Sequence, residues 1–142
     1  TASCSGDAFL EEVARDVGLP LVPATTNVWA ASGILANAAA VVTGRYHPTI
    51  LAGLGGVPCV LLGADSHKTT SVQKMLGYPE IKTFPVFPDA SSIEAIARQV
   101  ERVLEERTAW SAQIRASAEE RAVEASAMSS LLGQGLGLQG RR

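Results

Sequence analysis

Arg45, Tyr46 and His47 lie between two short apolar runs, where an Arg-x-His pair can bind an anion and transfer a proton. The arginine side chain is a planar, permanently charged fork that suits a carboxylate or a phosphate group. The histidine can gain or lose a proton near neutral pH. These three residues therefore predict a site that holds an acidic ligand and protonates it.

The surrounding sequence predicts a strand–turn–helix–strand unit that positions this site. Residues 40–43 are typical of a buried strand, residues 49–54 of an apolar helix that opens at Pro48, and residues 57–62 of a second buried strand. Proline suits the first helical position because its missing N–H would have no partner there. In an open α/β sheet this turn lies at the carboxyl end of a strand, where ligands bind, and free N–H groups at the helix start favour an anion.

Composition limits the class of protein. The chain has 142 residues, of which 46% are hydrophobic, so it can bury one sizeable core. Its net charge of −2 gives no basic footprint for nucleic acid. Its apolar runs are shorter than the roughly 20 residues of a transmembrane helix, and we find no signal-peptide pattern. We therefore expect a cytoplasmic protein with no nucleic-acid partner and no transmembrane segment.

Cofactor and metal motifs are also missing from the sequence. The two cysteines, Cys4 and Cys59, give no disulfide framework, which favours a reducing compartment. Cys59 is expected to be a buried apolar residue. There is no G-x-G-x-x-G turn, no P-loop lysine motif and no Cys/His spacing typical of zinc. We expect no cofactor and no metal.

The rest of the chain alternates predicted helices with predicted strands. Strands are expected at residues 19–23 and 83–87; helices are expected at 7–17, 28–37, 72–76 and 91–104, the last continuing to about residue 132. Residues 63–70 are expected to form a loop, and Ser91 and Glu94 a capping box. This alternation predicts an α/β fold, a Rossmann-like parallel sheet of about four or five strands with helices on both faces and a long C-terminal helix. Trp29 and Trp110 are expected to pack.

Four sequence blocks resemble the polysaccharide pyruvyl transferase family. They are V-V-T-G-R-Y-H-P-T-I-L-A, then G-G-V-P-C-V-L-L, then a loop with H-K, then M-L-G-Y-P. The likeness covers about residues 7–103, with its specific part at 41–79, and is to the C-terminal half of a GT-B-like fold. It implies transfer of pyruvate, as a ketal, from phosphoenolpyruvate to two hydroxyls of a saccharide in exopolysaccharide biosynthesis for the cell envelope.

The resemblance also implies roles for individual residues. Arg45 and His47 match the family's Arg-x-His motif at the phosphoenolpyruvate site, and Lys68 matches a lysine after the next strand. His47 and Arg45 are the expected catalytic residues, with His47 as the acid. The expected substrate-binding residues are Thr43, Gly44, Arg45, Tyr46, His47 and Lys68. The chain departs from the family at Tyr46, usually a smaller aliphatic residue, and at Pro48, commonly Gly or Ala.

We expect three parts: a Rossmann-like donor-binding domain at residues 1–107, a helical extension at 108–132 and a disordered tail at 133–142. The chain does not begin with Met and its first residues resemble the exit from a strand. We therefore expect a fragment that lacks its N-terminal domain and is inactive alone.

Two alternatives stay open. The first is the C-terminal half of a GT-B glycosyltransferase or sugar-nucleotide epimerase, with Arg45 and His47 on a diphosphate. Against it, no pair of acidic residues is placed to hold a ribose. The second is a non-catalytic ligand-binding or interaction domain, with the long terminal helix as a partner surface.

Overall fold

The computed structural model describes residues 8–63 and 67–135 of the chain. Within these residues the elements follow in the order α1 (Ala8–Asp16), α2 (Val28–Ala36), β1 (Val41–Thr43), α3 (Tyr46–Leu54), β2 (Cys59–Leu62), α4 (Lys68–Met75), β3 (Thr83–Phe84), α5 (Ala90–Glu105) and α6 (Arg107–Gly135). The central order from β1 to β2 is the strand–turn–helix–strand unit that the sequence predicts.

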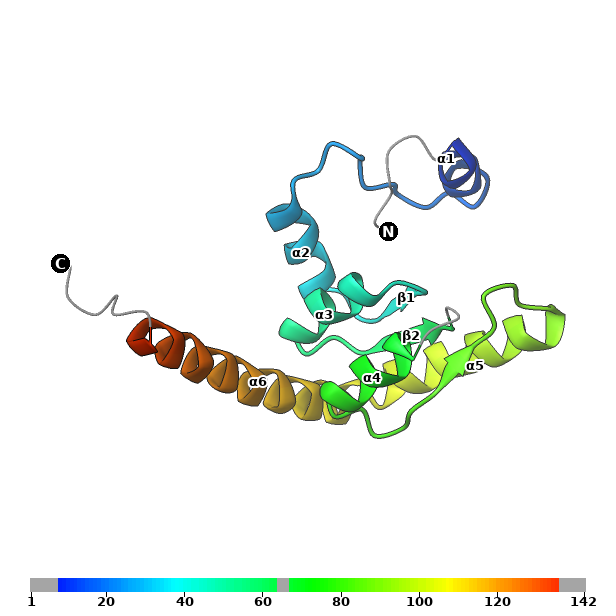
Figure 1. Cartoon of the computed structure of the whole chain (residues 1–142). Coiled ribbons are helices and arrows are strands. Elements are labelled where there is room, and N and C mark those ends of the chain that lie inside the picture. The colour runs from blue at the N-terminus through cyan, green and yellow to red at the C-terminus, as the bar shows by residue number, and fades with distance from the viewer. Residues whose placement is uncertain (1–7, 64–66, 136–142) are drawn as a thin grey trace.

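The three strands form one parallel sheet in the order β1-β2-β3. Val41 pairs with Cys59, and Leu61 pairs with Thr83. Helices α3 and α4 are the crossovers between these strands, while α5 contacts β2. Figure 1 shows α4 in front of the sheet and α5 behind it. The α/β class, the parallel sheet and the Rossmann-like arrangement are confirmed.

The predicted strand at residues 19–23 is wrong, and the described sheet has three strands instead of four or five. These residues belong to no strand of the described sheet, and Leu19, which is exposed, donates its N–H to the Ala14 carbonyl at 2.8 Å. Pro20 and Pro23 each lack the N–H that a ladder needs, so the sequence disfavours a paired strand here. In Figure 1 the segment runs from α1 to α2 above the sheet.

The core lies around β2 and includes residues from the start of α6. Val60 and Leu61 of β2 are almost fully buried, and Ile114 of α6 is completely buried. Trp110 is 3% exposed, and its ring meets the Tyr78 ring edge-on at 5.6 Å. The predicted anchoring role of Trp110 is therefore confirmed. The predicted packing of Trp29 is wrong, because its side chain is 83% exposed.

Two glycines allow α6 to approach the turns that lead out of α3 and α4. Gly56 and Gly77 have φ angles of 72° and 65°, in the left-handed region that favours glycine. A Cβ on Gly56 would lie 2.9 Å from the Ser111 carbonyl oxygen. Helix α6 therefore packs at the amino edge of the strands, opposite the edge where the predicted site lies.

The ends of the last two helices, α5 and α6, differ from the prediction. The N-cap of α5 is Asp89 and not Ser91. The Asp89 carboxylate accepts a hydrogen bond from the Ser92 N–H at 2.8 Å. Helix α6 is a separate helix that begins at Arg107 and includes the first three residues of the predicted tail. Residues 136–142 of that tail, residues 64–66 of the predicted loop and residue 7 of the first predicted helix lie outside the described residues. Over the described part of the chain, no helix has the length and apolar character needed to cross a membrane.

Candidate functional site

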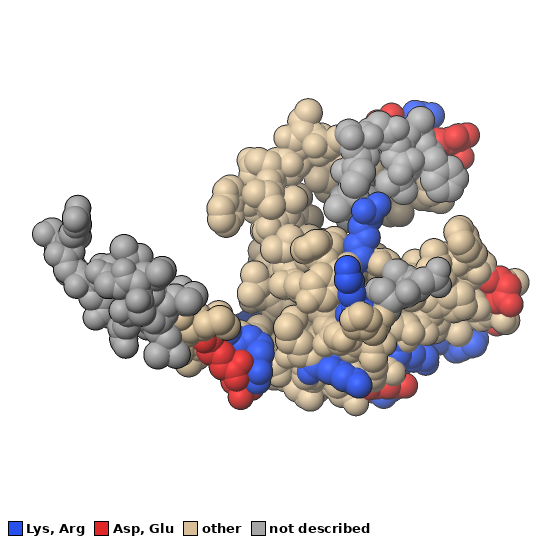
Figure 2. All heavy atoms as spheres, in the orientation of Figure 1, with Lys and Arg blue, Asp and Glu red and all other residues tan. Residues whose placement is uncertain are grey.

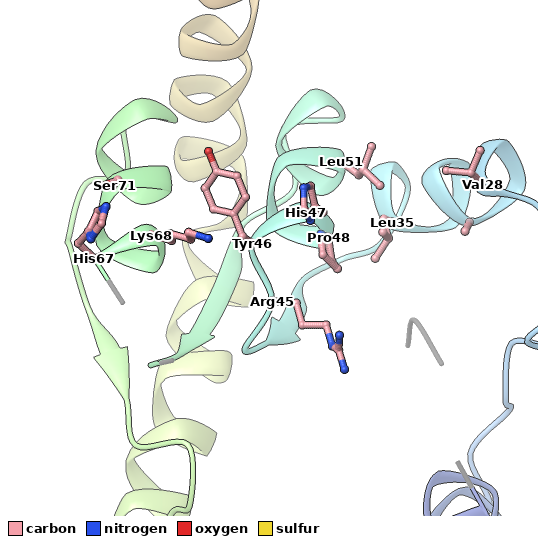
Figure 3. A pocket seen from close by; sticks show the side chains of 11 residues that line it. Val28, Leu35, Arg45, Tyr46, His47, Pro48, Leu51, His67, Lys68 and Ser71 are labelled. Atoms are coloured by element: carbon pink, nitrogen blue, oxygen red, sulfur yellow. The ribbon is translucent and has the colours of Figure 1, made fainter. Parts of the chain in front are cut away.

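A pocket of about 760 Å³ opens at the carboxyl edge of the sheet. Three helices supply its wall: α2, the start of α3 and the start of α4 (Figure 3). The lining residues are Val28, Ala31, Leu35, Arg45, Tyr46, His47, Pro48, Leu51, His67, Lys68 and Ser71. The Arg-x-His turn therefore lies where strand ends of a parallel sheet place ligand-binding residues.

The turn after β1 is fixed by two threonine hydroxyls on either side of Arg45. The Arg45 N–H donates to Thr43 Oγ1 at 3.0 Å, and Thr49 Oγ1 donates to the Arg45 carbonyl at 2.9 Å. Arg45 is the N-cap of α3, with extended backbone angles (φ −110°, ψ 140°). These bonds hold the backbone from which the Arg45 and His47 side chains project.

Helix α3 begins at Tyr46, so the predicted start at Pro48 is wrong by two residues. Pro48 is the third helical residue. A proline fits there because the first four N–H groups of a helix have no partner within the helix. The helix start therefore offers the backbone N–H groups of Tyr46 and His47, and not that of Pro48, to a ligand.

Tyr46 and His47 contact each other at the mouth of the pocket. Their rings meet edge-on with centroids 5.6 Å apart. Tyr46 is half-buried and packs against the core, whereas His47 is exposed. The tyrosine ring thus supports one side of the imidazole, and the rest of the imidazole stays accessible.

Helix α4 supplies the opposite wall and begins earlier than predicted. It starts at Lys68, within the predicted loop, with His67 as an N-cap that makes no side-chain capping bond. Lys68 and Ser71 are three residues apart and line the same pocket. The starts of α3 and α4 therefore both open on the pocket, and the positive ends of two helices favour an anion there.

Four of the six predicted substrate-binding residues line this pocket: Arg45, Tyr46, His47 and Lys68. Thr43 and Gly44 do not line it. Thr43 fixes the turn instead, and Gly44 has no positive φ and no close neighbour that would exclude a side chain. Figure 3 shows the Lys68 side chain pointing toward Tyr46, while the Arg45 side chain extends to the other side of the turn.

The apolar wall from α2 was not predicted from the sequence. Val28, Ala31 and Leu35 recur at the i, i+3 and i+7 spacing of one helix face, and they line the pocket beside Leu51 of α3. That spacing was visible in the sequence. However, a face of this kind usually packs in a core, and nothing in the sequence showed which surface it would meet.

Charge at the site is positive within the described residues. Arg45 has no ion pair with a carboxylate in this part of the chain. On the face shown in Figure 2, basic side chains lie near the centre, whereas toward the periphery basic and acidic side chains occur together. The described residues contain no cluster of His, Cys, Asp and Glu that could hold a metal ion.

A buried polar pair lies in the core under α3. The Cys59 N–H donates to Tyr78 Oη at 2.9 Å, and both side chains are buried. Burial raises the pKa of the Cys59 thiol to about 11 and raises the pKa of Tyr78 still further above its ordinary value. Both groups are therefore neutral at physiological pH and stabilise the core without carrying charge toward the pocket.

Comparison with known families supports the predicted resemblance. Residues 5–66 match the family model described as polysaccharide pyruvyl transferase. The match covers a little under half of the chain, includes Arg45 and His47, and ends before Lys68. Over these residues the chain is therefore similar to the polysaccharide pyruvyl transferase family. Neither curated proteins nor solved structures give a significant match.

Proposed function

We propose that this chain is the donor-binding part of a polysaccharide pyruvyl transferase and that phosphoenolpyruvate is its donor. The observation that carries this proposal is the pocket at the carboxyl edge, where two helix N-termini meet Arg45 and Lys68. Phosphoenolpyruvate carries a phosphate and a carboxylate, so it needs fixed cations and backbone N–H groups on more than one side.

Arg45 would bind one of the two anionic groups of the donor, and Lys68 would bind the other. The Arg45 fork suits two oxygens of one group, and the Lys68 ammonium acts as a point charge for the other. The two side chains come from different helices of the pocket wall. Binding the donor would therefore link α3 to α4 across the carboxyl edge of the sheet.

His47 would act as the general acid. It gives a proton to the methylene carbon of the donor, and the neighbouring carbon then accepts a saccharide hydroxyl, which loses its own proton. The bond from that carbon to the phosphate oxygen breaks, and inorganic phosphate leaves with the electron pair. A second hydroxyl adds to the same carbon, loses its proton and completes the ketal.

The apolar wall supports a place for the acceptor. Val28, Ala31 and Leu35 line the pocket from α2, on the other side of α3 from Lys68 (Figure 3), and Tyr46 presents an aromatic ring. A saccharide ring has apolar faces that pack well against such side chains. The acceptor would lie between α2 and Tyr46, with its hydroxyls toward the donor. Groups outside this pocket are expected to complete the acceptor site, so that this chain alone does not turn over.

A titration tests the proposal. Phosphoenolpyruvate is added to the ¹⁵N-labelled 142-residue chain and, in parallel, to Arg45→Ala and to the matched surface variant Arg98→Ala. We expect shifts at residues 45–48 and 67–71 that are lost in Arg45→Ala and kept in Arg98→Ala. Binding that survives Arg45→Ala would refute this donor site. A response to nucleotide sugars instead of phosphoenolpyruvate would favour the glycosyltransferase or epimerase alternative.

A further inference from the structure

A second pocket lies at the opposite edge of the sheet from the proposed donor site. It has a volume of about 460 Å³ and lies between the first turns of α6, the end of α2 and the turn after α3. Its lining residues are Ala36, Asn37, Gly55, Val57, Arg107, Thr108, Ser111, Ala112 and Arg115. None of these residues is acidic, and two are arginines.

The polar side chains of α6 in this pocket are all hydrogen-bond donors on one helix face. Arg107, Ser111 and Arg115 follow at intervals of four residues, and Thr108 is three residues before Ser111. In the described part of the chain, neither arginine pairs with a carboxylate, and the Thr108 and Ser111 hydroxyls make no hydrogen bond.

Each arginine is held in place by one backbone carbonyl oxygen. Arg115 Nη2 donates to the Gly55 carbonyl at 3.0 Å, and Arg107 Nη2 donates to the Ala38 carbonyl at 3.5 Å. A guanidinium group has five N–H donors, so most donors of each group have no protein partner. Both side chains are exposed, and the shorter bond restricts the motion of Arg115, which lowers the entropic cost of binding a ligand there.

The local charge balance favours an anion. Helices α2 and α3 end at this pocket, and each helix C-terminus carries roughly half a negative charge. The two guanidinium groups carry about two positive charges, so they outweigh the two helix ends. The nearest acidic side chain along the chain, Glu106, is bonded to Arg102 and Trp110 instead.

We propose that this pocket binds a phosphate-bearing small molecule through Arg107 and Arg115, with hydrogen bonds from Thr108 and Ser111. Tetrahedral phosphate oxygens can accept from both guanidinium groups and from hydroxyls at once. This site is separate from the proposed donor pocket, because the two pockets share no lining residue.

The test uses pyrophosphate as the probe, with the ¹⁵N-labelled 142-residue chain. Calorimetry and NMR shifts are measured for the unchanged protein and for Arg107→Gln. Matched controls are Arg98→Gln, which removes an exposed arginine on α5, and Arg45→Gln, which alters only the donor pocket. We expect shifts at residues 55–57 and 107–115, and an affinity that falls roughly tenfold or more in Arg107→Gln. Because pyrophosphate can also enter the donor pocket, the affinity of the second pocket is read from the shifts at residues 55–57 and 107–115. Both controls should keep that affinity within about twofold.

Three results would overturn the proposal. They are the absence of binding at millimolar pyrophosphate, an unchanged affinity in Arg107→Gln, and shifts confined to residues 45–48 and 67–71 with affinity lost in Arg45→Gln.

Arg115→Lys is a second variant that keeps the charge but removes the planar fork, and it should weaken binding by a smaller factor. Thermal melts establish that each variant is folded. Failure here leaves the donor-site test unaffected, because that test depends on Arg45.

Discussion

Thr49 Oγ1 donates a hydrogen bond to the carbonyl of Arg45 at 2.9 Å, and Thr49 is completely buried. One turn of α3 therefore connects the core directly to the residue that presents the Arg45 side chain. The Arg45 N–H is held from the other side by Thr43 Oγ1. The geometry of the exposed turn is thus determined by two threonine hydroxyl groups, and the Thr49 side chain that carries one of them is buried.

Thr49→Val should lower the melting temperature by a few degrees. The substitution keeps the shape of the side chain but removes a hydrogen bond worth about 1 kcal/mol. Thr49→Ser keeps the hydroxyl and should retain the bond to Arg45. Circular dichroism melts of both variants measure this difference. A melting temperature of Thr49→Val equal to that of the unchanged protein would show that the hydroxyl contributes no net stability.

Lys68→Gln should weaken phosphoenolpyruvate binding about tenfold, because a charge-assisted contact to an anionic group is lost. Lys74→Gln removes the same charge from the last turn of the same helix, away from the pocket, and should leave the affinity nearly unchanged. Calorimetry of both variants separates a local contact from an effect of total charge. Similar losses in the two variants would contradict the local contact.

Glu106→Gln should reduce the loss of stability in acid. Hydrogen bonds from Trp110 Nε1 and from Arg102 lower the pKa of Glu106 below its ordinary value of 4.5. Because the pKa of Glu106 is lower in the folded protein than in the unfolded one, its charged form stabilises the fold at pH values above the ordinary pKa. This stability is lost as the pH falls through the pKa of the folded protein. Melting temperatures between pH 7 and pH 2.5 should therefore decline less steeply for Glu106→Gln. If the melting temperatures of the unchanged protein and of Glu106→Gln declined in parallel with pH, Glu106 would not contribute to the loss of stability in acid.

Cys59 should be inert to thiol reagents in the folded protein. Its thiol is buried, and its pKa is raised to about 11, so little thiolate exists at neutral pH. A Cys4→Ser background leaves Cys59 as the only thiol, and reaction with an aromatic disulfide reagent should then follow unfolding. Because the folded pKa is raised, the stability linked to this group is lost as pH rises from about 9 toward 11. Rapid labelling at pH 8 without denaturant would contradict this prediction.

Gly56→Ala should destabilise the fold, whereas Gly33→Ala should stabilise it slightly. A left-handed alanine costs about 1–2 kcal/mol, and the added Cβ would also approach the Ser111 carbonyl to 2.9 Å. Gly33 lies within α2 with an ordinary φ and nothing within 4 Å, so alanine there gains up to about 1 kcal/mol of helix propensity. Urea unfolding of both variants should give shifts of opposite sign.

The sequence predicted the parts of the fold whose structure depends mainly on the residues of the segment itself. The apolar runs around Arg45 became the paired strands β1 and β2; β2 is buried as predicted, whereas Val42 of β1 is exposed. The two failures have different causes. At residues 19–23 the prediction gave too little weight to Pro20 and Pro23, which cannot donate to a ladder. The exposure of Trp29 depends on which surface α2 meets, and the local sequence does not determine that.

The candidate site shows the same division. Arg45 and His47 were found because charged and titratable residues at a strand end are unusual in themselves, whereas Lys68 was found through the family resemblance. The α2 wall was missed because Val28, Ala31 and Leu35 are ordinary apolar residues whose role depends on where α2 lies. The early start of α4 was missed because neither His67 nor Lys68 gives a helix-start signal; the His67 side chain makes no capping bond.

The length of α6 has a consequence for how this protein behaves in solution. A helix of 29 residues is about 43 Å long, whereas a compact chain of 142 residues has a radius of gyration of about 14 Å. Figure 1 shows the second half of α6 extending away from the sheet. A single molecule should therefore diffuse more slowly than a sphere of 14.8 kDa. Gel filtration would overestimate its mass, and sedimentation or light scattering is needed to distinguish an elongated monomer from a dimer.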